Sequence, residues 1–82
     1  MSDATPTVVL YARPGCHLCE EARDILRTID GLRWREVDID SDDRLLAKFL
    51  ERIPVVEVDG RVVSELVPDA DVIRDAVHTV DP

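Results

Sequence analysis

The chain has 82 residues, 45% of them hydrophobic, and a formal net charge of −8 at pH 7. This length and composition are typical of one compact domain, so we expect residues 1–82 to form a single domain with one core. The acidic charge disfavours nucleic acids and anionic membranes as partners, because both are bound through clustered Lys and Arg.

At the N-terminus, residues 1–6 are expected to form a disordered tail. They lack the basic and apolar regions of a signal peptide. No stretch of the chain reaches the roughly 20 consecutive apolar residues of a membrane-spanning helix. We therefore expect a cytoplasmic protein, and we expect it to be a monomer.

The first strand and the first helix are predicted from composition and spacing. Thr7–Tyr11 is rich in β-branched and aromatic residues and stops at a turn formed by residues 13–15. An apolar stripe with helical spacing follows, and we expect this helix to end at Asp30-Gly31, with Gly31 as the left-handed residue after its last turn. The stripe consists of Leu18, Ala22, Ile25, Leu26 and Ile29.

A second strand and a second helix follow in the same way. Leu32–Ile39 predicts a partly exposed strand, because charged residues occupy its centre. Asp40 or Ser41 is the expected N-cap of the next helix. The buried stripe of that helix consists of Leu45, Leu46, Phe49 and Leu50.

The last third of the chain predicts a hairpin and a final helix. Val55–Val58 and Arg61–Ser64 flank Asp59-Gly60, a dipeptide that tolerates the positive φ angles of a tight hairpin turn. The helix opens at Pro68-Asp69. Its stripe consists of Val72, Ile73, Ala76, Val77 and Val80. The first two strands must be parallel because a helix crosses between them, and the hairpin adds antiparallel strands to the same sheet.

The motif that carries chemistry contains the chain's two cysteines, Cys16 and Cys19. They are too close together to join distant segments, so a reactive role is favoured over a structural one. Cys16 lies at a helix N-terminus, where unpaired backbone N–H groups and the helix dipole favour the nucleophilic thiolate. Cys19 lies one turn later and can resolve a mixed disulfide. We predict thiol–disulfide exchange with Cys16 as the attacking thiol and Cys19 as the resolving thiol.

The sequence Arg-Pro-Gly-Cys-His-Leu-Cys after a strand, together with Ile53-Pro54 before a hairpin, resembles the glutaredoxin-like branch of the thioredoxin fold. The resemblance covers nearly the whole chain. It implies an α/β fold with the order β-α-β-α-β-β-α and a four-stranded mixed sheet in strand order 2-1-3-4. Helices one and three would cover one face, helix two the other, and the Ile53-Pro54 bond would be cis.

The resemblance also implies the substrate-binding residues. The backbone N–H and C=O of Ile53, before Pro54, would pair with an extended substrate. The charges around the motif itself are mixed: Arg13 and a protonated His17 would stabilise the Cys16 thiolate, whereas Glu20 and Glu21 would oppose it. The implied partners are a disulfide-containing protein or small thiol as substrate and a thiol or reductase as electron donor. Glutathione-using members carry a Gly-Gly pair near the position of Glu65, so we expect glutathione to be a poor substrate here.

Two other functions remain open at this stage. Cys16 and Cys19 supply only half of a four-ligand site for zinc, and an iron–sulfur cluster would have to be shared across a dimer with added thiols. A redox-inactive adaptor that binds proteins through the same groove would need neither thiol. We therefore assign no metal ligand and no cofactor.

Overall fold

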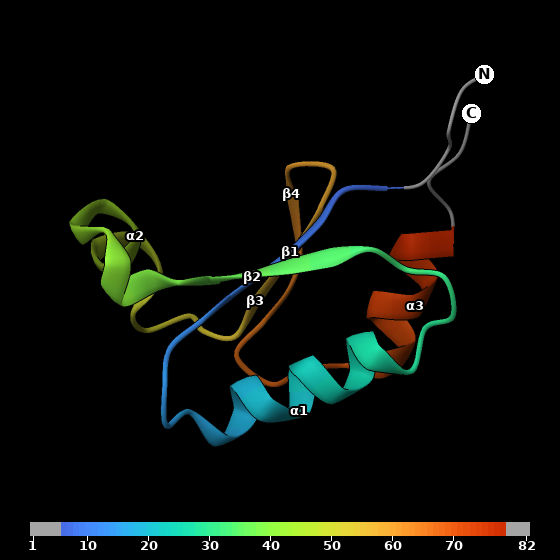
Figure 1. The fold of residues 1–82 in the computed structure, drawn as a ribbon, viewed down its shortest axis with the longest axis horizontal. Coiled ribbons are helices and arrows are strands. Elements are labelled where there is room, and N and C mark those ends of the chain that lie inside the picture. Colours follow the sequence, from blue (N-terminus) through green and yellow to red (C-terminus); the bar gives the residue numbers. More distant parts are fainter. Residues whose placement is uncertain (1–5, 79–82) are drawn as a thin grey trace.

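The structure is a computed structural model that describes residues 6–78, so the predicted tail, apart from Pro6, and the last stripe residue Val80 lie outside the described residues. The element order confirms the predicted one (Figure 1). The elements are β1 (Val8–Ala12), α1 (His17–Arg27), β2 (Trp34–Asp38), the 3₁₀ turn η1 (Ile39–Ser41), α2 (Asp43–Phe49), β3 (Val55–Val58), β4 (Arg61–Glu65) and α3 (Ala70–His78).

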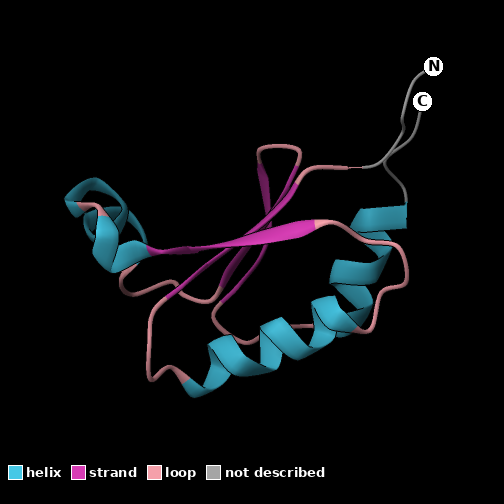
Figure 2. Cartoon of the chain, viewed as in Figure 1, coloured by secondary structure: helices cyan, strands magenta, loops and turns pink. Residues whose placement is uncertain are grey.

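The four strands form one mixed sheet in the order β2-β1-β3-β4, as predicted (Figure 2). Strand β1 pairs parallel to β2 and antiparallel to β3, and β3 pairs antiparallel to β4. Tyr11 lies opposite Val55, which in turn lies opposite Glu65. The end of β1, the start of β3 and the end of β4 therefore share one end of the sheet.

Helices α1 and α3 cover one face of the sheet, on which the larger of two apolar cores lies. Side chains alternate across a strand, and Val8, Leu10 and Ala12 of β1 point into this core. The two helices contribute Cys19, Ala22, Leu26, Ile73 and Val77. Ala22, Leu26, Ile73 and Val77 belong to the predicted stripes, but Cys19 was not predicted as a core residue, and Val72, which was, is 45% exposed.

A smaller core lies on the other face, beneath α2. Its buried members are Ile39, Phe49 and Val55. The ring of Tyr11 stacks on that of Phe49, with centroids 4.6 Å apart. The tyrosine hydroxyl donates to Glu57 over 3.3 Å. Burial, followed by the charge of Glu57, raises the pKa of Tyr11.

The hairpin turn has the predicted conformation, with φ of 52° at Asp59 and 83° at Gly60. Asp59 and Thr7 exchange two hydrogen bonds, from Asp59 N–H to the Thr7 carbonyl (2.8 Å) and from Thr7 N–H to the Asp59 carboxylate (2.9 Å). These bonds fix the turn beside the start of β1. The turn therefore lies at the opposite end of the sheet from the segment that follows β1.

The predicted end of the first helix is wrong. Helix α1 ends at Arg27, and Thr28 is its C-cap, with its hydroxyl donating to the carbonyl of Ile25 over 2.6 Å. Gly31 does have a positive φ, 74°, but in a separate turn beyond the helix. A threonine hydroxyl can satisfy a terminal carbonyl that the left-handed glycine would otherwise satisfy.

The predicted second strand was too long, and the predicted cap of the second helix was wrong. β2 ends at Asp38, whose side chain accepts from the Asp40 N–H over 2.8 Å and starts η1. This turn takes up Ser41, so Asp42 becomes the N-cap of α2 and accepts from the Arg44 N–H over 2.8 Å. Asp38, Asp40, Ser41 and Asp42 lie within five residues and each has a side chain that can act as a cap, so the spacing of the core side chains selects among them.

None of the helices described between residues 6 and 78 is both long enough and apolar enough to cross a bilayer.

Candidate active site

Cys16 is the N-cap residue of α1, as predicted for the attacking thiol. Its backbone is extended, with φ of −95° and ψ of 112°, and its Sγ accepts a hydrogen bond of 3.2 Å from the Cys19 N–H. An N-cap side chain that accepts from the first turn occupies the place where negative charge is most favourable on a helix. The contact would strengthen if the sulfur became a thiolate.

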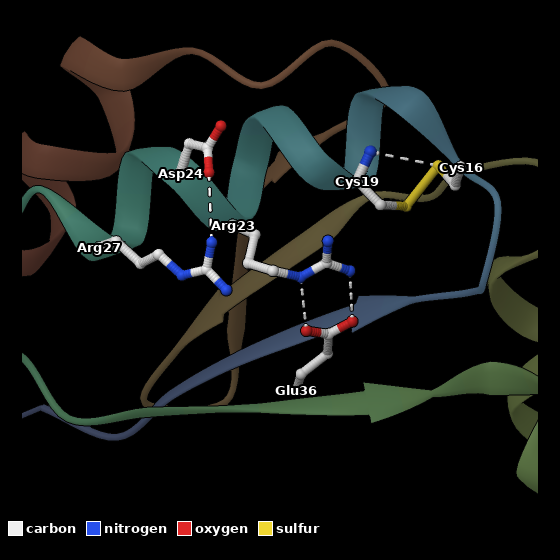
Figure 3. Close-up of polar contacts among 6 residues, drawn as sticks. All are labelled: Cys16, Cys19, Arg23, Asp24, Arg27 and Glu36. Carbon is white, nitrogen blue, oxygen red and sulfur yellow. Dashed lines mark hydrogen bonds and ion pairs between the residues drawn. A yellow bond between two sulfur atoms is a disulfide. The ribbon is translucent and has the colours of Figure 1, made fainter.

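The two cysteines are joined by a disulfide, with their Cα atoms 5.2 Å apart (Figure 3). Cys16 is half-buried, whereas Cys19 is completely buried in the larger core. A substrate sulfur can therefore approach Cys16 but not Cys19. The two cysteine side chains therefore differ in their access to solvent.

Ile53 and Pro54 form the segment directly before β3, and the peptide bond between them is cis, as predicted. Cys16 and Ile53 are both half-buried and pack against the larger core, and Pro54 is fully buried. The Ile53 N–H donates to the carbonyl of Phe49 over 3.0 Å. The expectation that this N–H is free is therefore wrong, because the last turn of α2 leaves carbonyls that need donors.

The side chains of Arg13 and His17 each lie beside a carboxylate. The Arg13 Nε lies 3.2 Å from Asp40, and the His17 Nε2 lies 3.4 Å from Glu21 in the next turn of α1. The His17 side chain is 84% exposed. Arg13 precedes Cys16 by three residues in the sequence, and His17 follows it directly. Their predicted role in substrate binding stays a prediction.

Arg52 is a residue near the site that the sequence analysis missed. Its guanidinium makes two parallel hydrogen bonds to Glu65, of 2.8 and 3.0 Å. Hydrogen bonds from Arg52 lower the pKa of the Glu65 carboxyl. The negative charge of Glu65 is therefore paired with the charge of Arg52. The sequence signal for this pair was the cation Arg52 just before Ile53-Pro54 and the anion Glu65 at the end of the hairpin.

The connection between β4 and α3 carries a strained residue. Leu66 has φ of 68°, a left-handed conformation that branched side chains rarely adopt. Its N–H donates to the Arg52 carbonyl over 2.9 Å, which ties the connection to the segment before Pro54. Leu66 and Val67 are 50% and 68% exposed. Such a conformation persists only where surrounding contacts enforce it.

A second bidentate ion pair joins α1 to β2 (Figure 3). Arg23, one turn after Cys19, donates to Glu36 over 2.8 and 2.6 Å. Hydrogen bonding to Arg23 lowers the pKa of Glu36, and the same bond raises that of Arg23. The pair fixes the helix that carries both cysteines to an edge strand of the sheet.

Cys16 and Cys19 could hold a metal ion only together with further ligand side chains. Within the described part of the chain, no three side chains among His, Cys, Asp and Glu gather as ligands. Cys16 and Cys19 are bonded to each other, and Cys19 is buried. The described residues therefore do not fit a zinc or iron–sulfur site within one chain, because such sites take four ligands.

A four-stranded mixed sheet with a Cys-x-x-Cys at the start of the helix after β1 and a cis-proline before β3 defines a thioredoxin-fold protein with a redox motif. Residues 7–77 match the family described as Glutaredoxin-like domain (DUF836), and the chain belongs to this family. A glutaredoxin-like fold with Cys16 and Cys19 at bonding distance fits a thiol oxidoreductase.

Solved structures show the same fold. Protein Ne2328 from Nitrosomonas europaea is 27% identical with a TM-score of 0.77, covering 94% of this chain and 96% of that one. Protein XcR50 from X. campestris is 29% identical with a TM-score of 0.77, covering 90% and 99%. A glutaredoxin from Brucella melitensis, 22% identical over 92% and 82% with a TM-score of 0.64, shares the fold. No curated protein matches the chain significantly.

Proposed function

We propose that this protein is a thiol–disulfide oxidoreductase that uses Cys16 as its nucleophile and Cys19 as its resolving thiol. One observation carries the proposal: Cys16, at the helix N-terminus, is only half-buried, whereas its bonded partner Cys19 is fully buried. A buried thiol can attack only a sulfur that is brought to it. The mixed disulfide formed at Cys16 supplies such a sulfur.

The proposed reaction has two exchanges. The Cys16 thiolate attacks one sulfur of the substrate disulfide, forms a Cys16–substrate bond and expels the other substrate sulfur as a thiolate, which takes up a proton. Cys19, after losing its proton to solvent, then attacks Cys16 and expels the second substrate thiolate. The substrate gains two electrons, and the protein loses two as its disulfide forms. An external thiol or reductase donates two electrons to restore the dithiol.

Trapping experiments test the assignment of the two cysteines. The reduced Cys19→Ser variant is expected to hold a stable mixed disulfide at Cys16 after exposure to a small disulfide, because nothing resolves it. The Cys16→Ser variant should form none, because its remaining thiol is buried. Intact-mass spectrometry with peptide mapping measures both. A mixed disulfide in Cys16→Ser, with none in Cys19→Ser, would reverse the assignment.

Alkylation kinetics test the environment of the nucleophile. In the reduced protein, iodoacetamide should modify Cys16 before Cys19, with an apparent pKa for Cys16 below the free thiol value of about 8.5. The cause is the helix N-terminus and the Cys19 N–H that already points at the Cys16 sulfur. Labelling of Cys19 first would contradict the proposal.

A further inference from the structure

We infer that Arg23 is a positioning residue for the resolving step, because its positive charge stabilises the thiolate form of Cys19. The inference rests on the proposed function and adds a charged residue to its second exchange. Three observations support it: the apolar surroundings of Cys19, the place of Arg23 on the same helix face, and the guanidinium nitrogen that the bonds to Glu36 do not use.

The resolving thiol lies in surroundings that cannot stabilise a negative charge. Cys19 is 0% exposed, and none of the buried residues among positions 6–78 is polar or charged. The side chains that share its cluster from β1, β3 and α3 are apolar: Val8, Leu10, Ala12, Val56, Val58, Ile73 and Val77. A thiolate there loses its hydration and gains no partner from these side chains. A charge at the rim of the core is therefore the group that can stabilise it.

Arg23 is the cation that α1 brings to this rim. It follows Cys19 by four residues, a spacing that places two side chains on one helix face with their Cβ atoms about 5 to 6 Å apart. Figure 3 shows both side chains extending from α1 toward the strands. Of the other charged side chains in the first two turns, Glu20 and Glu21 are exposed carboxylates, and His17 lies beside Glu21. The two carboxylates oppose a thiolate, whereas Arg23 favours it.

Glu36 fixes the guanidinium and leaves one side of it unused. This carboxylate lies opposite Leu10 in the pairing of β2 with β1, and Leu10 belongs to the same cluster as Cys19. It accepts from Nε and Nη2 of Arg23, so both bonds use one edge of the guanidinium. In Figure 3 the guanidinium lies between α1 and Glu36, with the third nitrogen turned back toward the helix. The Arg23 side chain is only 22% exposed, so water screens its charge only in part.

The charge acts on one sulfur in both directions of the step. In resolution, the Cys19 thiol loses its proton to solvent and its thiolate attacks the Cys16 sulfur. The Cys16–Cys19 bond forms, and the substrate leaves as a thiolate that takes up a proton. In the reverse reaction Cys19 is the leaving thiolate. Arg23 stays protonated throughout, so it contributes charge and no proton.

The resolution rate of a mixed disulfide tests the inference. Bis(2-hydroxyethyl) disulfide is added in an excess that makes attack by Cys16 the faster step, so the mixed disulfide accumulates. Its conversion to the Cys16–Cys19 disulfide is then a first-order reaction. Acid quenching and intact-mass spectrometry give its rate constant at a series of pH values. We expect the midpoint of this pH profile to rise by about one unit in Arg23→Gln.

The rates on the two sides of the midpoint should change in opposite directions. Below it, the thiolate fraction of Cys19 falls about tenfold, but the more basic thiolate is about threefold more nucleophilic, so resolution should slow by about threefold. Above it, only the gain in nucleophilicity remains, and Arg23→Gln should be about threefold faster than the original chain. A substitution that merely loosened the helix would slow resolution at every pH.

Three further variants separate charge from structure. Glu36→Gln removes the counter-charge but retains an acceptor, so it should lower the midpoint, opposite to Arg23→Gln. Arg23→Lys retains the cation and should keep most of the original profile. Arg27→Gln is the matched control, because Arg27 is a 63% exposed cation one turn later, paired with Asp24, and it should leave the midpoint unchanged. Thermal unfolding shows whether each variant is folded.

The outcomes separate the inference from the proposed function. Failure of the original chain to form a mixed disulfide at Cys16 would remove the proposed function itself. Normal resolution with an unchanged midpoint in Arg23→Gln, or an equal shift in Arg27→Gln, would overturn only the role of Arg23. A shift of Glu36→Gln in the same direction as Arg23→Gln would do the same. If Arg23→Gln does not fold, a midpoint that stays or rises in Glu36→Gln overturns the inference.

The attack by Cys16 is measured separately in the Cys19→Ser background, where the effect of Arg23→Gln should vanish. An equal change in the rate of mixed-disulfide formation there would mean that the arginine acts on Cys16, and the inference would be wrong.

Discussion

The two faces of the sheet are built differently. The face under α1 and α3 is wholly apolar and contains 11 buried residues, including Cys19. The face under α2 has a cluster of 3 buried residues, edged by the Tyr11 hydroxyl bonded to Glu57 and by two cations over the Phe49 ring. The larger cluster therefore holds the buried cysteine, and the smaller one is centred on Phe49 with the ring of Tyr11 stacked on it.

This difference indicates how the site is divided between the faces. Helix α1 presents the cysteines from the larger core, whereas α2 ends at Phe49 and receives the N–H of Ile53. The cysteines thus belong to the larger cluster, whereas Ile53 packs against both clusters and is bonded through its N–H to the end of α2. Substitutions in the two cores should affect the protein in different ways.

The largest effect is expected for Phe49→Ala. Truncating this side chain, which is 1% exposed, removes the centre of the smaller core and should cost about 3 to 5 kcal/mol in the free energy of unfolding. Domains of this size have only roughly 4 to 12 kcal/mol. Urea unfolding measures the loss. Exchange should also slow, because α2 no longer positions Ile53. A loss below about 1 kcal/mol would mean that the smaller cluster contributes little, as at a surface site.

A slightly smaller loss is expected for Leu26→Ala in the larger core. The residue is 1% exposed, and its truncation should cost about 2 to 5 kcal/mol. The folded fraction should retain its rate of exchange, because the cysteine motif lies at the other end of α1. Rates normalised to folded protein make the comparison with Phe49→Ala. Equal slowing in both variants would remove the proposed division between the faces.

The cap of α2 gives a third, smaller effect. Asp42→Ala should lower the free energy of unfolding by about 1 kcal/mol, because it removes the acceptor for the Arg44 N–H. Asp43→Ala is the matched control, since Asp43 is acidic and adjacent but provides no cap, and it should cost only a few tenths. Thermal unfolding of both variants separates the cap from the charge. A larger loss for Asp43→Ala would overturn the assignment.

The smallest effect concerns the ion pair that joins α1 to β2. A double-mutant cycle with Arg23→Gln and Glu36→Gln should give a coupling of about 0.2 to 1 kcal/mol at pH 7, because both side chains retain contact with water. The pKa of Glu36 is lowered in the folded protein, so its stabilisation is complete above the ordinary value of 4.5 and is lost as pH falls through the folded value. Coupling that is unchanged at pH 2 would contradict the pairing.

Much of this protein could be predicted from local sequence alone. The helical stripe from Leu18 onward, the strand Thr7–Tyr11 and the Asp59-Gly60 turn each depend on residues that are neighbours along the chain. The order of these elements and the parallel pairing of the first two strands followed from the sequence, whereas the strand order 2-1-3-4, the faces covered by the helices and the cis bond before Pro54 came from the family resemblance. The caps could not be predicted as firmly, because several adjacent polar residues compete for each one.

What the sequence by itself determined is therefore the series of elements and the place of Cys16 at a helix N-terminus, since both follow from periodicity and short spacing. The tertiary structure alone decided which cysteine is buried and which charges are paired. Arg23 and Glu36, and likewise Arg52 and Glu65, are 13 residues apart and meet only because the sheet aligns their elements. The same alignment of elements lets the Ile53 N–H donate to the Phe49 carbonyl. It also leaves Leu66 exposed and in a left-handed conformation. Contacts between distant residues depend on packing, which no local pattern encodes.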